Sequence, residues 1–149
     1  MSHPKARAAA LHASPEDAEA QFYDAMRDGD VERVMAVWAD DDEIVCVHPG
    51  GARVVGPLAV RAAFEAVFAS GHIAVQAEHV KQVHAMGCAV HSVLERIDVV
   101  TVEGPQTGWI VATNVYVKTG QGWRMVAHHA SPGAPDEIPE IVDTPAILH

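Results

Sequence analysis

The stretch that decides the fold runs from Ala112 to Pro132 and reads ATNVYVKTGQGWRMVAHHASP. Both halves are rich in β-branched and aromatic residues, and Gly120-Gln121-Gly122 between them has the chemistry of a tight turn. The pattern predicts two antiparallel strands joined as a hairpin. Turn signals at Met86-Gly87 and Gly104-Pro105 divide the preceding residues in the same way, so we expect four long strands between His72 and Ala130.

Three helices are predicted ahead of this meander. The first begins at Ser14-Pro15, where serine can cap the helix and proline fits the first turn, and it ends at Gly29. The second begins at the capping residue Asp30, and the third runs from about Pro57 to Ser70-Gly71. Helices followed by a run of long strands are typical of an α+β domain in which a curved sheet wraps the helices.

A short strand is expected between the second and third helices, at Glu43–His48. Its period of two places Ile44, Cys46 and His48 on one face. At the strand end, His48 either bonds the backbone of the following turn or acts as a functional imidazole. Cys46 and His48 could in principle share a metal, but the sequence shows no second pair of ligands at zinc spacing, so no metal site is predicted.

Two polar features of the last hairpin also suggest a site. Asn114 lies among valines, and burying an amide is costly unless it is hydrogen-bonded. It therefore either fixes the core through a neighbouring side chain or serves a ligand. His128 and His129 are adjacent in a strand, so they point to opposite faces and only one of them can reach an interior site.

Composition excludes several classes of protein. The formal charge of −10 disfavours nucleic acid and anionic membrane surfaces as partners. No apolar run is long enough to span a bilayer, and two cysteines make a weak disulfide framework, so we expect a soluble cytoplasmic protein. We expect a flexible N-terminus at 1–13, one domain at 14–132, and an extended acidic tail with prolines at 133–149.

Three stretches of the chain resemble the nuclear transport factor 2-like superfamily, and within it the SnoaL-like group of small cyclases and isomerases. They are residues 29–42, 47–57 and 112–132, and the resemblance spans roughly Pro15 to Pro132. It implies a cone-shaped α+β roll, with three N-terminal helices packed on a strongly curved and mostly antiparallel sheet. It also implies a homodimer that binds a small organic molecule in an interior pocket.

The resemblance also implies residue roles, through ketosteroid isomerase as the superfamily's best understood enzyme. The general-base position falls on His48, the tyrosine position on Phe22 beside Tyr23, and the protonated-aspartate position on Asn114. In relatives the inward set of the last strand corresponds to Trp123, Met125, Ala127, His129 and Ser131. We therefore expect His48, Asn114 and His129 as the catalytic group, whereas steroid isomerase activity itself is not expected because the oxyanion hole is not reproduced.

The remaining expectations concern the pocket wall and the class of function. Tyr23, Trp38 and Cys46 are expected to contact the ligand, although Trp38 also fits the apolar core. No cofactor is expected. Acid-base chemistry of an isomerase, cyclase, dehydratase or hydrolase type is one interpretation, and whether the protein is an enzyme stays open. The alternative interpretation is a non-catalytic ligand-binding or self-association module. It is suggested by the end of the domain, which also resembles the association domain of the calcium/calmodulin-dependent kinase.

Overall fold

The computed structural model describes residues 12–71, 73–133 and 137–143. Its helices are α2 (Pro15–Asp28), α3 (Val31–Met35) and α4 (Pro57–Phe68). Its strands are β1 (Val45–Val47), β2 (Arg53–Val55), β3 (Val75–Ala85), β4 (Cys88–Thr101), β5 (Gly104–Thr119) and β6 (Gly122–Pro132). The predicted order of helices followed by a meander is confirmed, and β2 is an additional short strand after the turn that closes β1.

Local sequence signals set the ends of the first two helices. The Ser14 hydroxyl accepts a hydrogen bond from the Asp17 amide, 3.1 Å away, at the start of α2. Gly29 ends the helix at φ 64°, a left-handed conformation that glycine adopts without steric cost. Asp30 caps α3 through the Arg33 amide. The helix stops at Met35, before Trp38, which instead forms a β-bridge with Met125.

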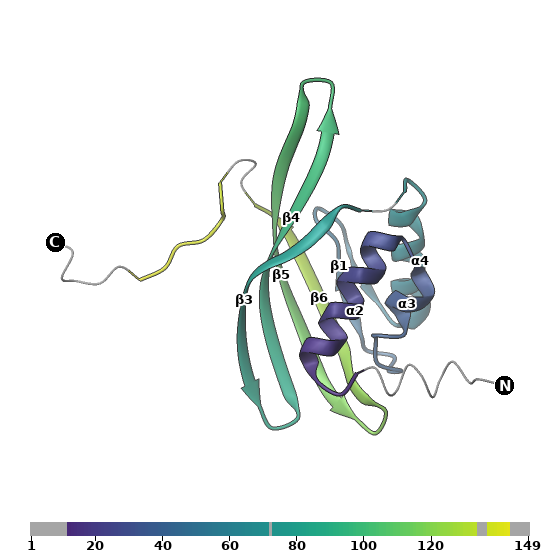
Figure 1. Cartoon of the computed structure of the whole chain (residues 1–149). Coiled ribbons are helices and arrows are strands. Elements are labelled where there is room, and N and C mark those ends of the chain that lie inside the picture. The colour runs from purple at the N-terminus through teal and green to yellow at the C-terminus, as the bar shows by residue number, and fades with distance from the viewer. Residues whose placement is uncertain (1–11, 72, 134–136, 144–149) are drawn as a thin grey trace.

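The six strands form one sheet in the order β2-β1-β6-β5-β4-β3. All neighbouring pairs are antiparallel except β1 and β6, which are parallel. Figure 1 shows the long strands bending around the helices, which lie together on one side of the sheet, while the far end of the β4–β5 hairpin projects beyond them. The concave face is the side that the helices cover. The expected α+β cone is therefore confirmed.

The hydrophobic core lies between the helices and the concave face. Phe22 of α2 and Phe64 of α4 are both fully buried, with ring centroids 5.9 Å apart and planes nearly perpendicular. This edge-to-face arrangement is favourable for aromatic pairs. Small residues of the strands, such as Ala112 and Ala130, belong to the same buried cluster. Apolar contact therefore contributes to holding the helices on the sheet.

One irregularity in β6 controls which side chains reach the core. Val115 pairs with Ala127, whereas the next residue of β5, Tyr116, pairs with Met125. Val126 is therefore an extra residue, a β-bulge, and the alternation of faces changes phase there. On the N-terminal side of the bulge Met125 is buried. On the C-terminal side His128 is buried, where an uninterrupted strand would have turned His129 inward.

The two ends of the chain differ from the expected boundaries in one respect. Residues 1–11 lie outside the described residues, but His12 belongs to the segment expected to be flexible and is fully buried. Its carbonyl oxygen accepts a hydrogen bond from the Trp123 amide at 2.8 Å, which joins His12 to β6. In the tail, 137–143 has no regular structure, and Ile141 is fully exposed. No helix among the described residues is long and apolar enough to cross a membrane.

Candidate functional site

A row of polar side chains crosses the concave face of the sheet. Register pairs Cys46 of β1 with His128 of β6, His128 with Asn114 of β5, and Asn114 with His91 of β4. All four side chains are buried, none being more than 1% exposed. We call these four residues the inward row. A row of this kind is costly in a protein core unless every polar group has a partner.

Asn114 is the hub of the hydrogen bonds in the inward row. Its Nδ2 donates to the hydroxyl oxygen of Tyr23 at 3.0 Å and to Glu19 Oε2 at 3.3 Å. Its Oδ1 accepts from His128 Nδ1 at 2.5 Å. The amide thus joins α2 to β6 across the core. Both of its polar atoms are used within the protein, which agrees with the interpretation that Asn114 fixes the core.

Glu19 of α2 accepts hydrogen bonds from side chains of two strands, β4 and β5. Besides Asn114, its Oε2 accepts from His91 Nδ1 and from the Tyr116 hydroxyl, each at 2.9 Å. Glu19 is only 7% exposed, so these bonds replace most of the water that a carboxylate would otherwise bind. The bond from Nδ1 also fixes the tautomer of His91, since a carboxylate oxygen can only accept. The free lone pair of the neutral ring is then on Nε2.

A second interior carboxyl, Glu95 of β4, has a different environment. It is 3% exposed, and its Oε2 accepts a hydrogen bond of 2.7 Å from the Tyr23 hydroxyl. Burial raises the pKa of Glu95 to about 7; the hydrogen bond from Tyr23 opposes this shift, and the charge of Glu19 adds to it. A carboxyl that titrates near neutral pH can both give and accept a proton under ordinary conditions.

His48 and Cys46 lie at the β1 end of the interior. His48 Nε2 is 3.7 Å from Cys46 Sγ, which confirms that the two residues share a face. Burial lowers the pKa of His48, so the ring is neutral and able to accept a proton at pH 7. Burial, with a contribution from the Glu95 charge, raises the pKa of Cys46 to about 12, so this thiol is not a nucleophile. The His48 ring contacts Phe64, with ring centroids 4.8 Å apart.

The expectation that His129 points inward is corrected by the structure. His129 is exposed, and its neighbour His128 is buried against Phe22, with ring centroids 5.1 Å apart. The cause is the bulge at Val126, which reverses the alternation that relatives suggested. Burial, together with the nearby His48 and His129 charges, lowers the pKa of His128 to about 3. The interior imidazole of β6 is therefore neutral, and its ring centroid lies 6.2 Å from that of His48.

The wall residues predicted from the sequence are placed in two different parts of the core. Tyr23 is 2% exposed and belongs to the polar network, whereas the adjacent Phe22, at the position expected for a tyrosine, is apolar core. The Trp38 ring centroid is 6.4 Å from that of Phe64, and Trp38 lines a separate hollow of about 260 Å³ between α3 and α4. The structure therefore brings together Tyr23, Asn114, Cys46 and His48, and it separates them from Trp38 and His129.

Five residues of the network were missed by the sequence analysis: Glu19, His91, Glu95, Tyr116 and His128. The signal for some of them is present in the pattern. Glu19 and Tyr23 are four residues apart and share a helix face. In β4 the buried residues Ala89, His91, Val93 and Glu95 alternate, so two polar residues share the inward face. Without a known strand register, that face could not be distinguished from the outer one.

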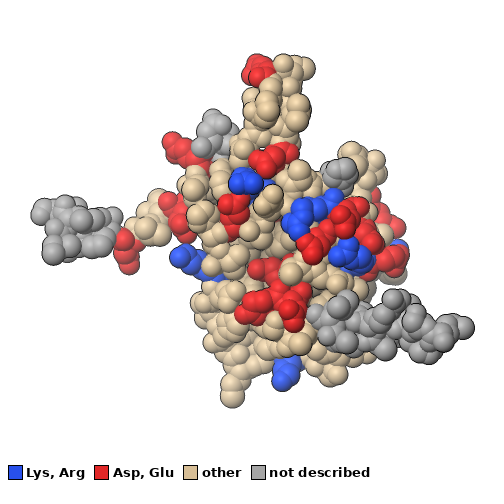
Figure 2. All heavy atoms as spheres, viewed as in Figure 1, with Lys and Arg blue, Asp and Glu red and all other residues tan. Residues whose placement is uncertain are grey.

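An open hollow of about 300 Å³ between α2 and β3 leads toward the network. Its lining includes Glu19 and Tyr23, together with three charged residues of the same helix, Glu16, Asp24 and Arg27. Arg27 forms an ion pair with Asp24, so the lining keeps an excess of carboxylates. Figure 2 shows acidic side chains gathered over the α2 side of the molecule. The approach to the interior from this side is therefore negatively charged, and it favours neutral or cationic ligands over anions.

The family model of the SnoaL-like domain matches residues 16–135, which include the helices and strands of the described fold apart from Pro15, the first residue of α2. A solved protein from Thiobacillus denitrificans, proposed to be a calcium/calmodulin-dependent protein kinase type II association domain, is 37% identical. The match covers 83% of this chain and 98% of that one, with a TM-score of 0.76. No functionally curated protein matches the chain.

Two further solved structures are similar. A proposed dehydratase of the NTF2-like family from Streptomyces avermitilis is 28% identical over 77% of this chain and 90% of that one, with a TM-score of 0.69. The kinase hub of S. rosetta is 20% identical over 89% of this chain and 99% of that one, with a TM-score of 0.64, which shows likeness of fold alone. The chain therefore belongs to the SnoaL-like family, within the nuclear transport factor 2-like superfamily.

Proposed function

We propose that the protein binds a small neutral organic molecule in its interior and catalyses proton transfer on it. The observation that carries this proposal is Glu95, a buried carboxyl whose pKa is about 7 and whose hydrogen-bond donor is the Tyr23 hydroxyl. A carboxyl with a strongly raised pKa destabilises the fold at neutral pH, and such groups concentrate at functional sites. A purely structural core would be more stable with an apolar residue in its place.

The groups around Glu95 suggest distinct roles in a reaction at a carbonyl compound. His48 is held neutral by burial and would take a proton from a carbon beside the carbonyl group. Protonated Glu95, whose Oε2 accepts a hydrogen bond from Tyr23, would donate a hydrogen bond through its other oxygen to the substrate oxygen on which negative charge develops. His48 would then return the proton either to the same carbon or to another carbon of the ligand. Return to another carbon is an isomerisation, with no net gain or loss of protons.

Asn114 and His128 have a supporting role in this proposal. Asn114 donates to the Tyr23 hydroxyl, which leaves the hydroxyl proton directed at Glu95. His128 holds the amide in that orientation by donating to Oδ1. The aromatic rings of Phe22 and Phe64, which contact His128 and His48, make the surroundings apolar. A ligand with an apolar body and one carbonyl group fits these features, whereas the acidic approach disfavours carboxylates and phosphates.

The experiment begins with a thermal-shift screen of neutral carbonyl compounds, because a ligand that binds only the folded protein raises its apparent stability. Each compound that stabilises the protein is then incubated with it in D₂O, and deuterium at the carbon beside the carbonyl is followed by NMR. We expect incorporation with the wild type and a loss of at least about a hundredfold in His48→Gln and in Glu95→Gln.

His129→Gln is the matched control, because it changes an exposed imidazole on the other face of β6. It should exchange deuterium as the wild type does. Exchange that persists in both His48→Gln and Glu95→Gln would contradict the proposal. If exchange were lost in His129→Gln instead, the catalytic histidine of β6 would be His129, as the family resemblance implied.

A second candidate, self-association, is favoured by the outer face of the sheet. Register places Val83, Val90, Val115 and Ala127 in one row on the face opposite Asn114. Val83 is 71% exposed, and the other three are only partly covered. We propose that a second copy of the chain packs on this face to give a homodimer. The likeness to a proposed kinase association domain supports association, and free Cys46 and Cys88 are compatible with a reducing cytoplasm.

A further inference from the structure

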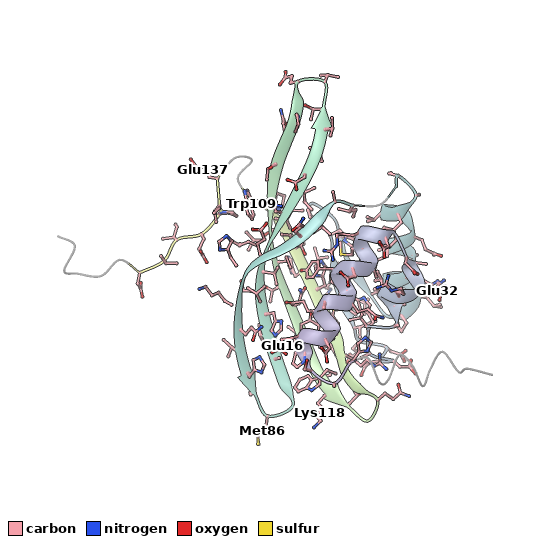
Figure 3. The ribbon with its side chains drawn as sticks, in the orientation of Figure 1. Glu16, Glu32, Met86, Trp109, Lys118 and Glu137 are labelled. Atoms are coloured by element: carbon pink, nitrogen blue, oxygen red, sulfur yellow. The ribbon has the colours of Figure 1, made fainter. Side chains whose placement is uncertain are left out.

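A second group of chemistry-bearing side chains lies where α2 meets the ends of β3 and β4. Glu16 is in the first turn of α2, His84 is near the end of β3, and His91 is on β4. One ligand atom from each of these residues lies within 4.8 Å of the other two. In Figure 3, the labelled Glu16 projects from the start of α2 toward the strands.

The sheet register explains why the two histidines meet. His84 pairs with Ala89 and His91 pairs with Gln82, so the imidazoles are diagonal neighbours on the same face of the β3–β4 ladder. Their rings are stacked, with centroids 5.8 Å apart and an angle of 27° between planes. His84 Nε2 is 3.9 Å from the Glu16 carboxylate. The arrangement therefore depends on the fold and is not a chance contact of neighbouring residues in the sequence.

His91 provides the independent sign of a ligand. Its side chain is fully buried, and its Nε2 has no hydrogen-bond partner among the described residues. Leaving such an atom unpaired costs about 1–3 kcal/mol, so an unpaired buried nitrogen calls for a partner. Because Nδ1 donates to Glu19, Nε2 is the atom that carries the free lone pair of the neutral ring. A metal ion accepts a lone pair of this kind.

We propose that Glu16, His84 and His91 bind a divalent ion of the zinc type. Two imidazoles and one carboxylate form a known open zinc donor set, which leaves a fourth position for water or a ligand. Glu19 has the place of the outer carboxylate that orients a metal-bound histidine through its second ring nitrogen. The carboxylates of Glu16 and Glu19 beside the adjacent hollow add attraction for a cation, whereas Asp24 in the same lining is paired with Arg27.

The geometry requires only small movements to close around an ion. Zinc bonds of about 2.0–2.1 Å in a tetrahedral site bring ligand atoms to roughly 3.3 Å from one another. His91 is fixed by burial and by Glu19, whereas the side chains of His84 and Glu16 are 45% and 50% exposed. The movement that closes the site therefore falls on the exposed side chains of His84 and Glu16.

The test is titration of the metal-free wild-type protein with Zn²⁺ by calorimetry, and with Co²⁺ by visible absorption. We expect one ion per chain with micromolar or tighter affinity, and a tetrahedral cobalt spectrum. His84→Ala and Glu16→Gln change exposed side chains, so they should fold normally and bind at least about tenfold more weakly. His129→Ala is the matched control and should bind as the wild type does.

NMR of the imidazole nitrogens locates the ion without any substitution. Co²⁺ should broaden the His84 and His91 resonances at substoichiometric amounts while His129 stays sharp. The proposal is overturned if the wild type binds Zn²⁺ no more tightly than about 100 µM. It is overturned equally if His84→Ala and Glu16→Gln retain full affinity, or if the broadened imidazoles are others. None of these outcomes depends on the proposed proton-transfer activity.

Discussion

Two neighbouring rows of residues, one on each face of the sheet, reverse the usual distribution of polar and apolar side chains. The inward row, Cys46, His128, Asn114 and His91, is polar and buried, whereas the outward row next to it in the register is apolar and partly exposed. Folding alone would favour the reverse, because burying apolar groups stabilises a protein and burying polar groups costs free energy. The inversion indicates that each face has a task beyond folding.

The two faces also differ in how their groups are satisfied. On the inward face, Asn114 and Glu19 link His128, Tyr23, Tyr116 and His91 into one hydrogen-bonded network within the chain. On the outward face, Val83 and its neighbours have no covering element among the described residues. Apart from His91 Nε2, the hydrogen bonds of the inward row are therefore made within one chain, and its variants should change stability and chemistry. Variants of the outward face should change association.

The largest effect is expected from Asn114→Leu. The substitution keeps the number and branching of the side-chain heavy atoms but leaves the His128 N–H without an acceptor, and it removes one donor each from Tyr23 and Glu19. We expect the free energy of unfolding, from urea denaturation, to fall by roughly 3–4 kcal/mol. Thr113→Ala, its exposed neighbour on the outer face, should change it by less than about 0.5 kcal/mol. Equal effects of the two substitutions would contradict the contrast between the faces.

The next effect concerns Glu95 and pH. Its pKa is raised in the folded state, so its contribution to stability is fully present below the unfolded pKa near 4.5 and is lost as pH rises through about 7. Between pH 4.5 and 8, the wild type should therefore lose roughly 3 kcal/mol relative to Glu95→Gln. His128 and His48, whose lowered pKa values act in the opposite direction, are the same in both proteins and cancel in this difference. Parallel urea-denaturation profiles would contradict the assignment.

A smaller effect separates the two adjacent histidines of β6. His128→Ala removes a buried ring that packs on Phe22 and bonds Asn114, so it should destabilise the protein by about 2 kcal/mol. His129→Ala should be within about 0.5 kcal/mol of the wild type because its side chain is exposed. The comparison tests the bulge directly. If His129→Ala were the more damaging change, the register assigned to β6 would be incorrect.

The smallest effect is expected at the outward row. Val83→Glu adds a charge to an exposed position, so the monomer should keep its stability. In the proposed dimer the same charge would be buried, and the dissociation constant should rise at least about tenfold, or about 1.4 kcal/mol. Light scattering coupled to size-exclusion chromatography measures the change. Glu103→Gln, in the projecting β4–β5 hairpin, serves as a control of similar exposure. A wild type that is monomeric at high concentration would remove the basis for this prediction.

The sequence predicted the fold well because the fold depends on short-range signals. Ser14, Gly29 and Pro57 mark helix ends through local backbone chemistry, and the three hairpin turns separate strands that are rich in β-branched residues. The shared face of Cys46 and His48 was also predictable, since β1 is too short to contain an irregularity. Each of these features needs only a few neighbouring residues.

The site was predicted less completely because it depends on long-range register. A single extra residue, Val126, shifts the alternation of β6, so His128 points inward where His129 was expected. His91 and Glu95 could not be placed inside, because nothing local distinguishes the two faces of β4 when both contain polar residues. Glu19 looked like an ordinary helical acid. Its role follows only from three donors that come from residues 72 to 97 positions away along the chain.

The most direct test of the account is the titration of Glu95 itself. The side-chain carboxyl carbon is labelled with ¹³C, and its NMR shift is followed from pH 3 to pH 9, with Glu95→Gln identifying the resonance. The account predicts a midpoint near 7, because burial disfavours the charged form and Tyr23 provides only one compensating hydrogen bond. A midpoint near 4 would show an ordinary carboxylate and would contradict the proposed proton-transfer site.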